Sequence, residues 1–247
     1  MPLPHSTSDA AAAPGAARPP RYADFYAANR GGGLYSEAVS QRLGALVAAT
    51  AARLRLTPTA LTLVNLVVGL ATSAYAVARA DAVAAGRASA WVVGLVALLG
   101  WQVAYAFDCA DGQLARVTGR SSPRGARLDI LCDVAAQIAL VTALATTAAA
   151  QRPGAPVWLL AAFAGTWMVN LVTSVLAAGP QAASMVTSTG LPVRLVKLVR
   201  DYGAIIAAAG LILLVEPQWT IWLVAVFTTI NAAFLLASIA FTTRPAA

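Results

Sequence analysis

Long apolar segments follow one another along most of this chain, and they restrict the folds that it can adopt. Hydrophobic residues make up 59% of the 247 residues and charged residues only 11%. A typical soluble domain has about 25% charged residues. Because the backbone inside a bilayer must satisfy its own hydrogen bonds, such segments favour helices. The sequence therefore predicts an all-α integral membrane protein.

Six segments are predicted to cross the membrane as helices, since most are apolar over the roughly 20 residues that a bilayer requires. Their approximate ranges are 58–78, 89–116, 125–149, 156–178, 202–215 and 217–241, the fifth being short. Thr57 is placed to cap the first helix, with Pro58 at its first position. We expect these spans to form one domain over residues 57–243.

Two segments precede that domain. Residues 1–33 begin with a stretch rich in alanine and proline and show no signal-peptide pattern, so we expect a disordered cytoplasmic tail. Residues 34–56 are predicted to contain an amphipathic juxtamembrane helix, with Ser36 at its start. Its apolar residues recur at helical spacing: Val39, Leu43, Leu46, Val47 and Leu54. We expect this helix to lie in the membrane interface, the alternative being that it packs on the protein.

Basic residues gather at the ends of the apolar segments and give the chain a net charge of +7. They are not interleaved with aromatic residues, which favours an anionic membrane surface and no nucleic-acid partner. With the N-terminus in the cytoplasm, only Arg79, Arg87 and Arg152 fall outside. We therefore expect a protein of a bacterial plasma membrane whose N-terminus faces the cytoplasm.

Four aspartates interrupt the second and third apolar segments: Asp108, Asp111, Asp129 and Asp133. An aspartate at mid-bilayer costs roughly 2.5–3.5 kcal/mol, so these four need compensation. Spacings of three and four residues place each pair on one helical face, and residues 117–124 predict a tight reversal between the helices. Carboxylates suit Mg²⁺ or Mn²⁺, and two such ions suit displacement at phosphorus. A proton or ion pathway is the alternative.

Small residues and arginines surround these pairs in the sequence. The small residues are Gly112, Ala115 and Gly125. The arginines are Arg116, Arg120, Arg124 and Arg127. Together they predict a cleft with a small-residue wall and a cationic mouth that suits phosphates. Close helix packing and cytoplasmic anchoring are the alternative explanations.

The stretch from Asp108 to Asp133 resembles the signature of the CDP-alcohol phosphotransferase family, also called CDP-alcohol phosphatidyltransferases. It reads D-x-x-D-G-x-x-A-R, eight residues, then G-x-x-x-D-x-x-x-D, and all eight signature positions are filled. Pro58 and Thr62 also resemble the family's Pro-Asn-x-x-Thr element, although Thr59 stands where asparagine is usual. Members of the family have six spans and a site that faces the cytoplasm. The orientation predicted above likewise places the four aspartates at the cytoplasmic ends of the second and third spans.

The resemblance implies a transferase of phospholipid biosynthesis. The donor would be a CDP-alcohol, usually CDP-diacylglycerol, and the hydroxyl of a small polar acceptor would displace CMP. The four aspartates would hold two divalent cations, Mg²⁺ or Mn²⁺, with Asp133 also acting as general base. The residues implied near the CDP moiety are Gly112, Ala115, Arg116, Gly125 and Thr62. A homodimer in the membrane is expected on the same grounds.

The acceptor and the donor stay open. Arg194, Lys197 and Arg200 precede the fifth span at three-residue steps and would bind a phosphate of the acceptor or anchor the chain. A soluble donor such as CDP-inositol is an alternative to a lipid donor. A divalent-cation transporter is a remote alternative, because the outer part of the third span offers threonines and no carboxylate to continue a path.

Overall fold

The computed structural model describes residues 18–29, 33–177 and 201–243, and every regular element in these ranges is helical. The predicted all-α class is therefore confirmed. The α-helices are α1 (Tyr22–Ala27), α2 (Gln41–Arg53), α3 (Pro58–Ala84), α4 (Ala90–Val117), α5 (Pro123–Gln151), α6 (Val157–Ala177), α8 (Tyr202–Val215) and α9 (Thr220–Thr242). A π-helical turn, η1 (Ser36–Ser40), precedes α2, and a 3₁₀ turn, η2 (Pro217–Trp219), precedes α9.

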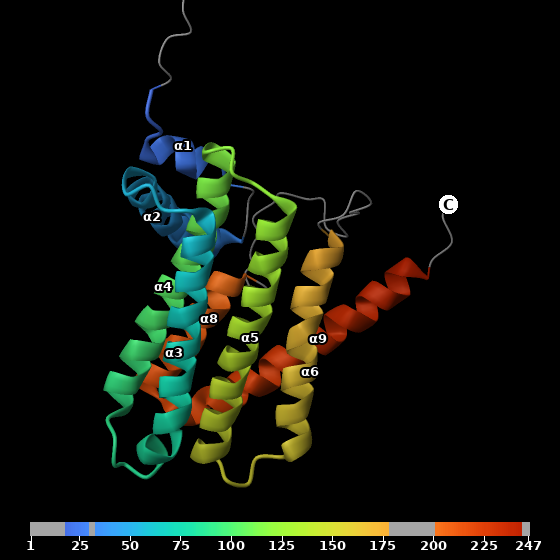
Figure 1. Cartoon of the computed structure of the whole chain (residues 1–247). Helices are drawn as coiled ribbons and strands as arrows, with labels where there is room; N and C mark the ends of the chain where they lie inside the picture. The colour runs from blue at the N-terminus through green and yellow to red at the C-terminus, as the bar shows by residue number, and fades with distance from the viewer. Residues whose placement is uncertain (1–17, 30–32, 178–200, 244–247) are drawn as a thin grey trace, which may run out of the picture.

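Hydroxyl side chains fix the starts of two of the helices that carry the site, α3 and α5. Thr57 Oγ1 accepts from the Ala60 amide at 3.2 Å, as predicted, and Pro58 opens α3. Ser122 Oγ accepts from the Gly125 amide at 3.0 Å and fixes the start of α5. Because few residues join α4 to α5, the two helices run antiparallel, and α3 packs against both of them (Figure 1).

The first span is longer than predicted. Helix α3 continues six residues past residue 78, to Ala84. The exposed residues Arg79 and Asp81 mark where the apolar pattern stops, although the backbone stays helical. Loss of apolar character is thus a poor guide to a helix end that extends beyond a membrane.

Helix α3 packs against both α4 and α5, while α8 packs against α4 and α6 packs against α9. Figure 1 shows α9 crossing the other helices at a steep angle. Aromatic rings fill the core between α6 and α9. Trp167 stacks on Phe227 with centroids 4.5 Å apart, and Phe163 meets Trp167 edge-on at 5.6 Å.

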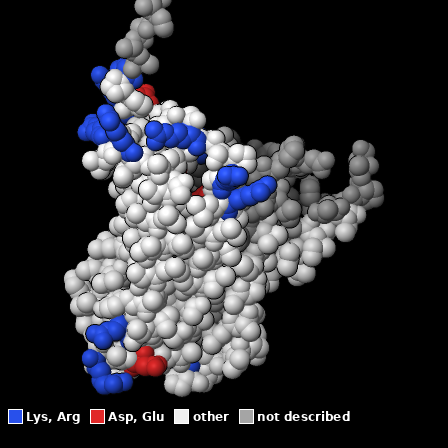
Figure 2. Space-filling view, viewed as in Figure 1, with Lys and Arg blue, Asp and Glu red and all other residues white. Residues whose placement is uncertain are grey.

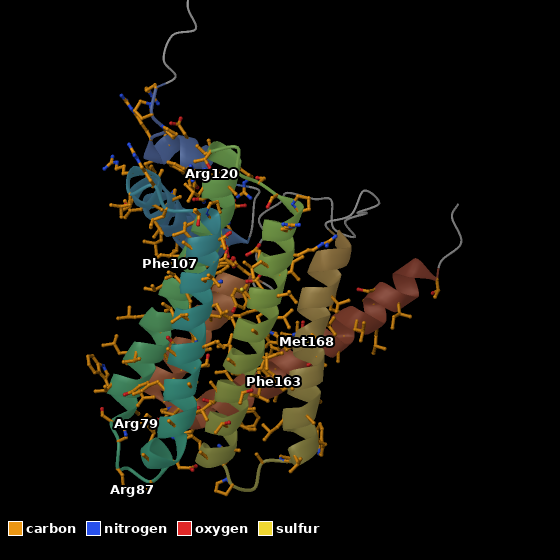
Figure 3. The ribbon with its side chains drawn as sticks, in the orientation of Figure 1. Arg79, Arg87, Phe107, Arg120, Phe163 and Met168 are labelled. Carbon is orange, nitrogen blue, oxygen red and sulfur yellow. The ribbon has the colours of Figure 1, made fainter. Side chains whose placement is uncertain are left out.

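Four of the described helices are long and apolar enough to cross a membrane: Pro58–Ala84, Ala90–Val117, Pro123–Gln151 and Pro217–Ala240. Figure 2 shows arginines at two ends of the visible face and an uncharged belt between them. Arg120 lies at one end, and Arg79 and Arg87 lie at the other (Figure 3). These features indicate an integral membrane protein. The remaining apolar helices, Val157–Val169 and Tyr202–Val215, are shorter, so the structure does not establish six spans.

The juxtamembrane helix α2 packs on the protein through its small residues. Gly44 lies so close to α4 that an added Cβ would come within 2.7 Å of Cys109 Cβ. Leu46 on α2 is 58% exposed, and Leu54, which follows the helix, is 66% exposed. Helix α2 therefore uses glycine and alanine against α4 and leaves leucines exposed.

Two features of the N-terminal region differ from the sequence-based expectation. The prediction that Ser36 caps the helix is wrong, because the helical backbone already includes Tyr35 and the Ser36 hydroxyl instead donates to Asp201. Helix α1 forms within the segment expected to be disordered, and its Phe25 side chain is fully buried among residues of α2, α3 and α4. A single aromatic residue that inserts between three helices accounts for an ordered turn in a polar segment.

Candidate functional site

The structure brings three of the four aspartates together. One carboxylate oxygen from each of Asp108, Asp111 and Asp129 lies within 4.8 Å of the other two. The spacing within each helix and the antiparallel return of α5 produce this cluster, as the sequence predicts. Asp133 lies one turn further along α5 and lines a cavity together with Asp108. All four carboxylates thus lie between α4 and α5, beside α3.

Helix α3 supplies hydrogen-bond donors to this cluster. Thr62 Oγ1 donates to Asp111 Oδ2 at 2.5 Å, and Asn65 Nδ2 donates to Asp108 Oδ1 at 3.2 Å. Both side chains are 4% exposed. Thr62 was predicted, but Asn65 was not. The sequence feature that could have identified Asn65 is its position three residues after Thr62, because this spacing places both side chains on one face of the helix.

The Arg116 side chain lies back along α4 and reaches the segment that follows α1. Its Nε donates to the Ala28 carbonyl at 2.8 Å. The guanidinium also lies over Gly112, where an added Cβ would come within 2.9 Å of Nη1. Residues 18–29 therefore help to hold a signature arginine in place, and glycine at position 112 leaves room for its side chain.

The other predicted residues divide into three groups. Ala115 and Gly125 are partly buried near the turn between α4 and α5, close in sequence to the cluster. Arg120, Arg124 and Arg127 are exposed around that turn, as a cationic mouth requires. The proposed acceptor-binding residues, Arg194, Lys197 and Arg200, lie outside the described residues.

The cluster fits a divalent cation. Asp129 Oδ1 is buried and has no hydrogen-bond partner among the described residues, which leaves an acceptor atom that needs a positive ligand. Oxygen ligands on opposite sides of a magnesium ion are about 4.2 Å apart, since each lies about 2.1 Å from the metal. Of three ligands only one pair can be opposite, and adjacent ligands lie about 3.0 Å apart, so the three oxygens, which lie within 4.8 Å of one another, would move closer together around a bound ion. The donor set consists of carboxylate oxygens, which suits Mg²⁺ or Mn²⁺.

Comparison with known proteins adds an independent finding. Residues 55–231 match the family model for CDP-alcohol phosphatidyltransferase. This range contains the four aspartates and the Thr62 contact, and it excludes α1 and α2. No curated protein sequence matches the chain. Because the matched range covers well over half of the chain and includes the acidic cluster, this protein belongs to the CDP-alcohol phosphatidyltransferase family.

Proposed function

We propose that this protein transfers a substituted phosphate group from CDP-diacylglycerol to the hydroxyl of a small polar acceptor and releases CMP. Membership of the family implies phosphatidyl transfer from a CDP-alcohol in phospholipid synthesis. The observation that carries the proposal is the cluster of Asp108, Asp111 and Asp129 within 4.8 Å, at one end of a bundle of apolar helices. A site in that position meets a lipid donor at the membrane surface, which favours CDP-diacylglycerol over a soluble donor.

In the proposed reaction, the acceptor oxygen forms a bond to the phosphorus that carries the diacylglycerol. The bond between that phosphorus and the bridging oxygen of the pyrophosphate breaks, and CMP leaves with the bridging oxygen. Asp133 takes the proton of the acceptor hydroxyl and later releases it to water. Its position beside the cavity, outside the cluster of three, supports this role because a base must keep an oxygen free of metal.

We assign the four aspartates to two divalent cations, Mg²⁺ or Mn²⁺. The family uses divalent cations, and bound cations would neutralise the pyrophosphate and favour departure of CMP. Thr62 and Asn65 orient Asp111 and Asp108 through the hydrogen bonds described above. The residues that we assign to the CDP moiety are Gly112, Ala115, Arg116, Gly125 and Thr62.

We also propose how the chain lies in the membrane. Helices α3, α4, α5, α6, α8 and α9 form six spans, with the N-terminus and the carboxylates toward the cytoplasm. The exposed arginines around the turn from α4 to α5 support this orientation. The exposed leucines of α2 support a location at the membrane interface, and we expect a homodimer.

The first test is CMP release by purified protein with Mg²⁺ and CDP-diacylglycerol. Serine, inositol, inositol phosphate and glycerol phosphate are supplied one at a time as acceptors. Release that depends on one of them supports the reaction and identifies the acceptor. If none supports release although the nucleotide binds, a soluble donor such as CDP-inositol replaces CDP-diacylglycerol in the proposal. Absence of nucleotide binding would contradict the proposed reaction altogether.

Thr62→Val is expected to weaken metal binding. Valine keeps the shape of threonine but cannot donate to Asp111, so the carboxylate loses the group that orients it. Loss of such an orienting hydrogen bond typically lowers metal affinity by about 10–100-fold. Titration of Mn²⁺, followed by electron paramagnetic resonance, measures the affinity directly.

Thr228→Val is the matched control for that substitution. Within the described part of the chain, the Thr228 hydroxyl donates only to the Val224 carbonyl of its own helix, α9. Its removal is therefore expected to leave Mn²⁺ affinity unchanged. Equal affinities for the Thr62 variant and the wild type would show that the hydroxyl does not orient a metal ligand.

A further inference from the structure

A cavity lies beside the acidic cluster, toward the middle of the helix bundle. The cavity volume is about 20 Å³, enough for one small polar group. Its lining comes from α3, α4, α5 and α8. The lining residues are Asn65, Gly69, Trp101, Ala104, Tyr105, Asp108, Asp133, Ala136, Leu140 and Tyr202. Asp108 and Asp133 thus connect the cavity to the proposed reaction centre.

Tyr202 is the polar residue that α8 brings to this cavity. It is the first residue of the helix, and its ring meets the ring of Tyr105 edge-on, with centroids 5.0 Å apart. Among the described residues, no hydrogen bond involves its hydroxyl, although the residue lines the same cavity as Asp108 and Asp133. Tyr202 is partly buried, and a phenol hydroxyl without a protein partner is available to a ligand.

A chain of hydrogen bonds holds Tyr105 and the start of α8, where Tyr202 lies. Asp201, 4% exposed, accepts from the Gly203 amide at 3.1 Å and from the Ser36 amide at 2.9 Å. The Ser36 hydroxyl also donates to Asp201 and thereby uses its single proton. Ser36 Oγ must therefore accept from the Tyr105 hydroxyl, which lies 3.1 Å away. Asp201 holds the start of α8, and Ser36 holds Tyr105 against Tyr202.

The backbone is fitted closely around this chain. An added Cβ at Gly33 would lie 2.2 Å from Asp201 Oδ2, inside the carboxylate. An added Cβ at Gly203 would lie 2.9 Å from Ser36 Oγ. Because Ser36 lies outside the matched family range, a segment N-terminal to the family domain contributes to this arrangement.

We propose that Tyr202 contacts the acceptor alcohol through its hydroxyl, and that Asp201 and Ser36 are positioning residues that hold it there. This inference rests on the proposed function. Attack and departure at phosphorus occur on opposite sides, roughly in line. The residues assigned to the nucleotide lie toward the turn from α4 to α5, whereas the cavity lies on the other side of the cluster, beside Asp133. The acceptor hydroxyl therefore approaches through the cavity.

The lining also restricts the chemistry of the group that enters. Among the described residues that line the cavity there are two carboxylates, an amide and two phenols, and there is no lysine or arginine. A hydroxyl or an ammonium group suits such a lining, because each donates hydrogen bonds and neither repels a carboxylate. A phosphate carried by the acceptor would have to stay outside this cavity.

Tyr202→Phe tests the assignment while keeping the ring that packs on Tyr105. We expect the acceptor KM to rise about tenfold, the typical effect of losing one hydrogen bond to a ligand. The KM for CDP-diacylglycerol is expected to stay unchanged. Tyr75→Phe is the matched control. It removes a hydroxyl from a ring beside Arg79, in the part of α3 that lies away from the acidic cluster, and should change neither KM. An unchanged acceptor KM in the Tyr202 variant would refute the proposal.

Ser36→Ala separates positioning from general packing. Without the Ser36 hydroxyl, Tyr105 loses its hydrogen bond to Ser36 and holds Tyr202 less firmly. We therefore expect a rise of about threefold in acceptor KM. If Ser36 acts through Tyr202, the double variant should match Tyr202→Phe alone. Effects that multiply in the double variant would show that Ser36 does not act through Tyr202.

Calorimetric binding provides a measurement that does not need turnover. Serine, inositol, inositol phosphate and glycerol phosphate are titrated into the Mg²⁺-containing wild type and Tyr202→Phe. Binding that weakens about tenfold in the variant supports the inference even if CMP is never released, in which case only the proposed reaction fails. Equal binding to both proteins, or binding of none of the four to the wild type, overturns the inference.

Discussion

Asp129→Asn is expected to lower CMP release by on the order of a thousandfold or more while the protein still inserts into the membrane. Asparagine has nearly the shape of aspartate but no charge and only one oxygen. Asp129 Oδ1 is buried without a hydrogen-bond partner among the described residues, so a metal is the ligand that explains its position. The measurement is CMP release at saturating Mg²⁺, together with Mn²⁺ binding followed by electron paramagnetic resonance.

The matched control for this substitution is Asp81→Asn. Asp81 is exposed near the far end of α3, and it lies outside the acidic cluster. The same change of charge there should leave both activity and Mn²⁺ affinity unaltered. Full activity of the Asp129 variant would overturn the assignment of this carboxylate to a metal, whatever the control shows.

The acidic cluster could be predicted from the sequence because its determinants are local. Spacings of three and four residues place Asp108 with Asp111 and Asp129 with Asp133 on single helical faces, and the Ser122 cap with Pro123 begins the returning helix. Capping and helical periodicity act within a few residues, so they do not depend on the rest of the fold. The same reasoning placed Thr57 correctly as the cap of α3.

The contacts that a distant segment supplies could not be predicted in this way. Ser36 and Asp201 are separated by 165 positions in the sequence, and neither residue shows locally that it has a partner. Phe25 likewise becomes fully buried only because α2, α3 and α4 leave a gap for its ring. Such contacts depend on tertiary packing, which overrides the local tendency of a polar segment to stay irregular.

Helix α8 shows why packing also matters for the site. It has only 14 residues, about 21 Å at 1.5 Å per residue, which is short for a bilayer core of about 30 Å. Its place is fixed by close approach to α4. An added Cβ at Gly94 would lie 2.2 Å from Leu214 Cα, and one at Gly210 would lie 2.5 Å from Leu98 Cα. Two glycines thus allow the backbones to touch.

Gly94→Leu is therefore expected to destabilise the protein strongly. The atoms that the new side chain would meet belong to the backbone of α8 and cannot rotate away. Overpacking of this kind costs about 3 kcal/mol, which corresponds to a fall of on the order of 10 °C in Tm. Because α8 begins with Tyr202, displacement of the helix should also raise the acceptor KM in any variant that remains folded.

Gly165→Leu separates this steric effect from the change of residue type. Gly165 lies in α6 with no atom within 4 Å of an added Cβ, so leucine has room there and also favours a helix more than glycine does. Its Tm should equal or slightly exceed that of the wild type in the same detergent. A Tm for Gly94→Leu as high as that of Gly165→Leu would mean that α8 moves freely along α4, and the close packing would then not hold Tyr202 at the cavity.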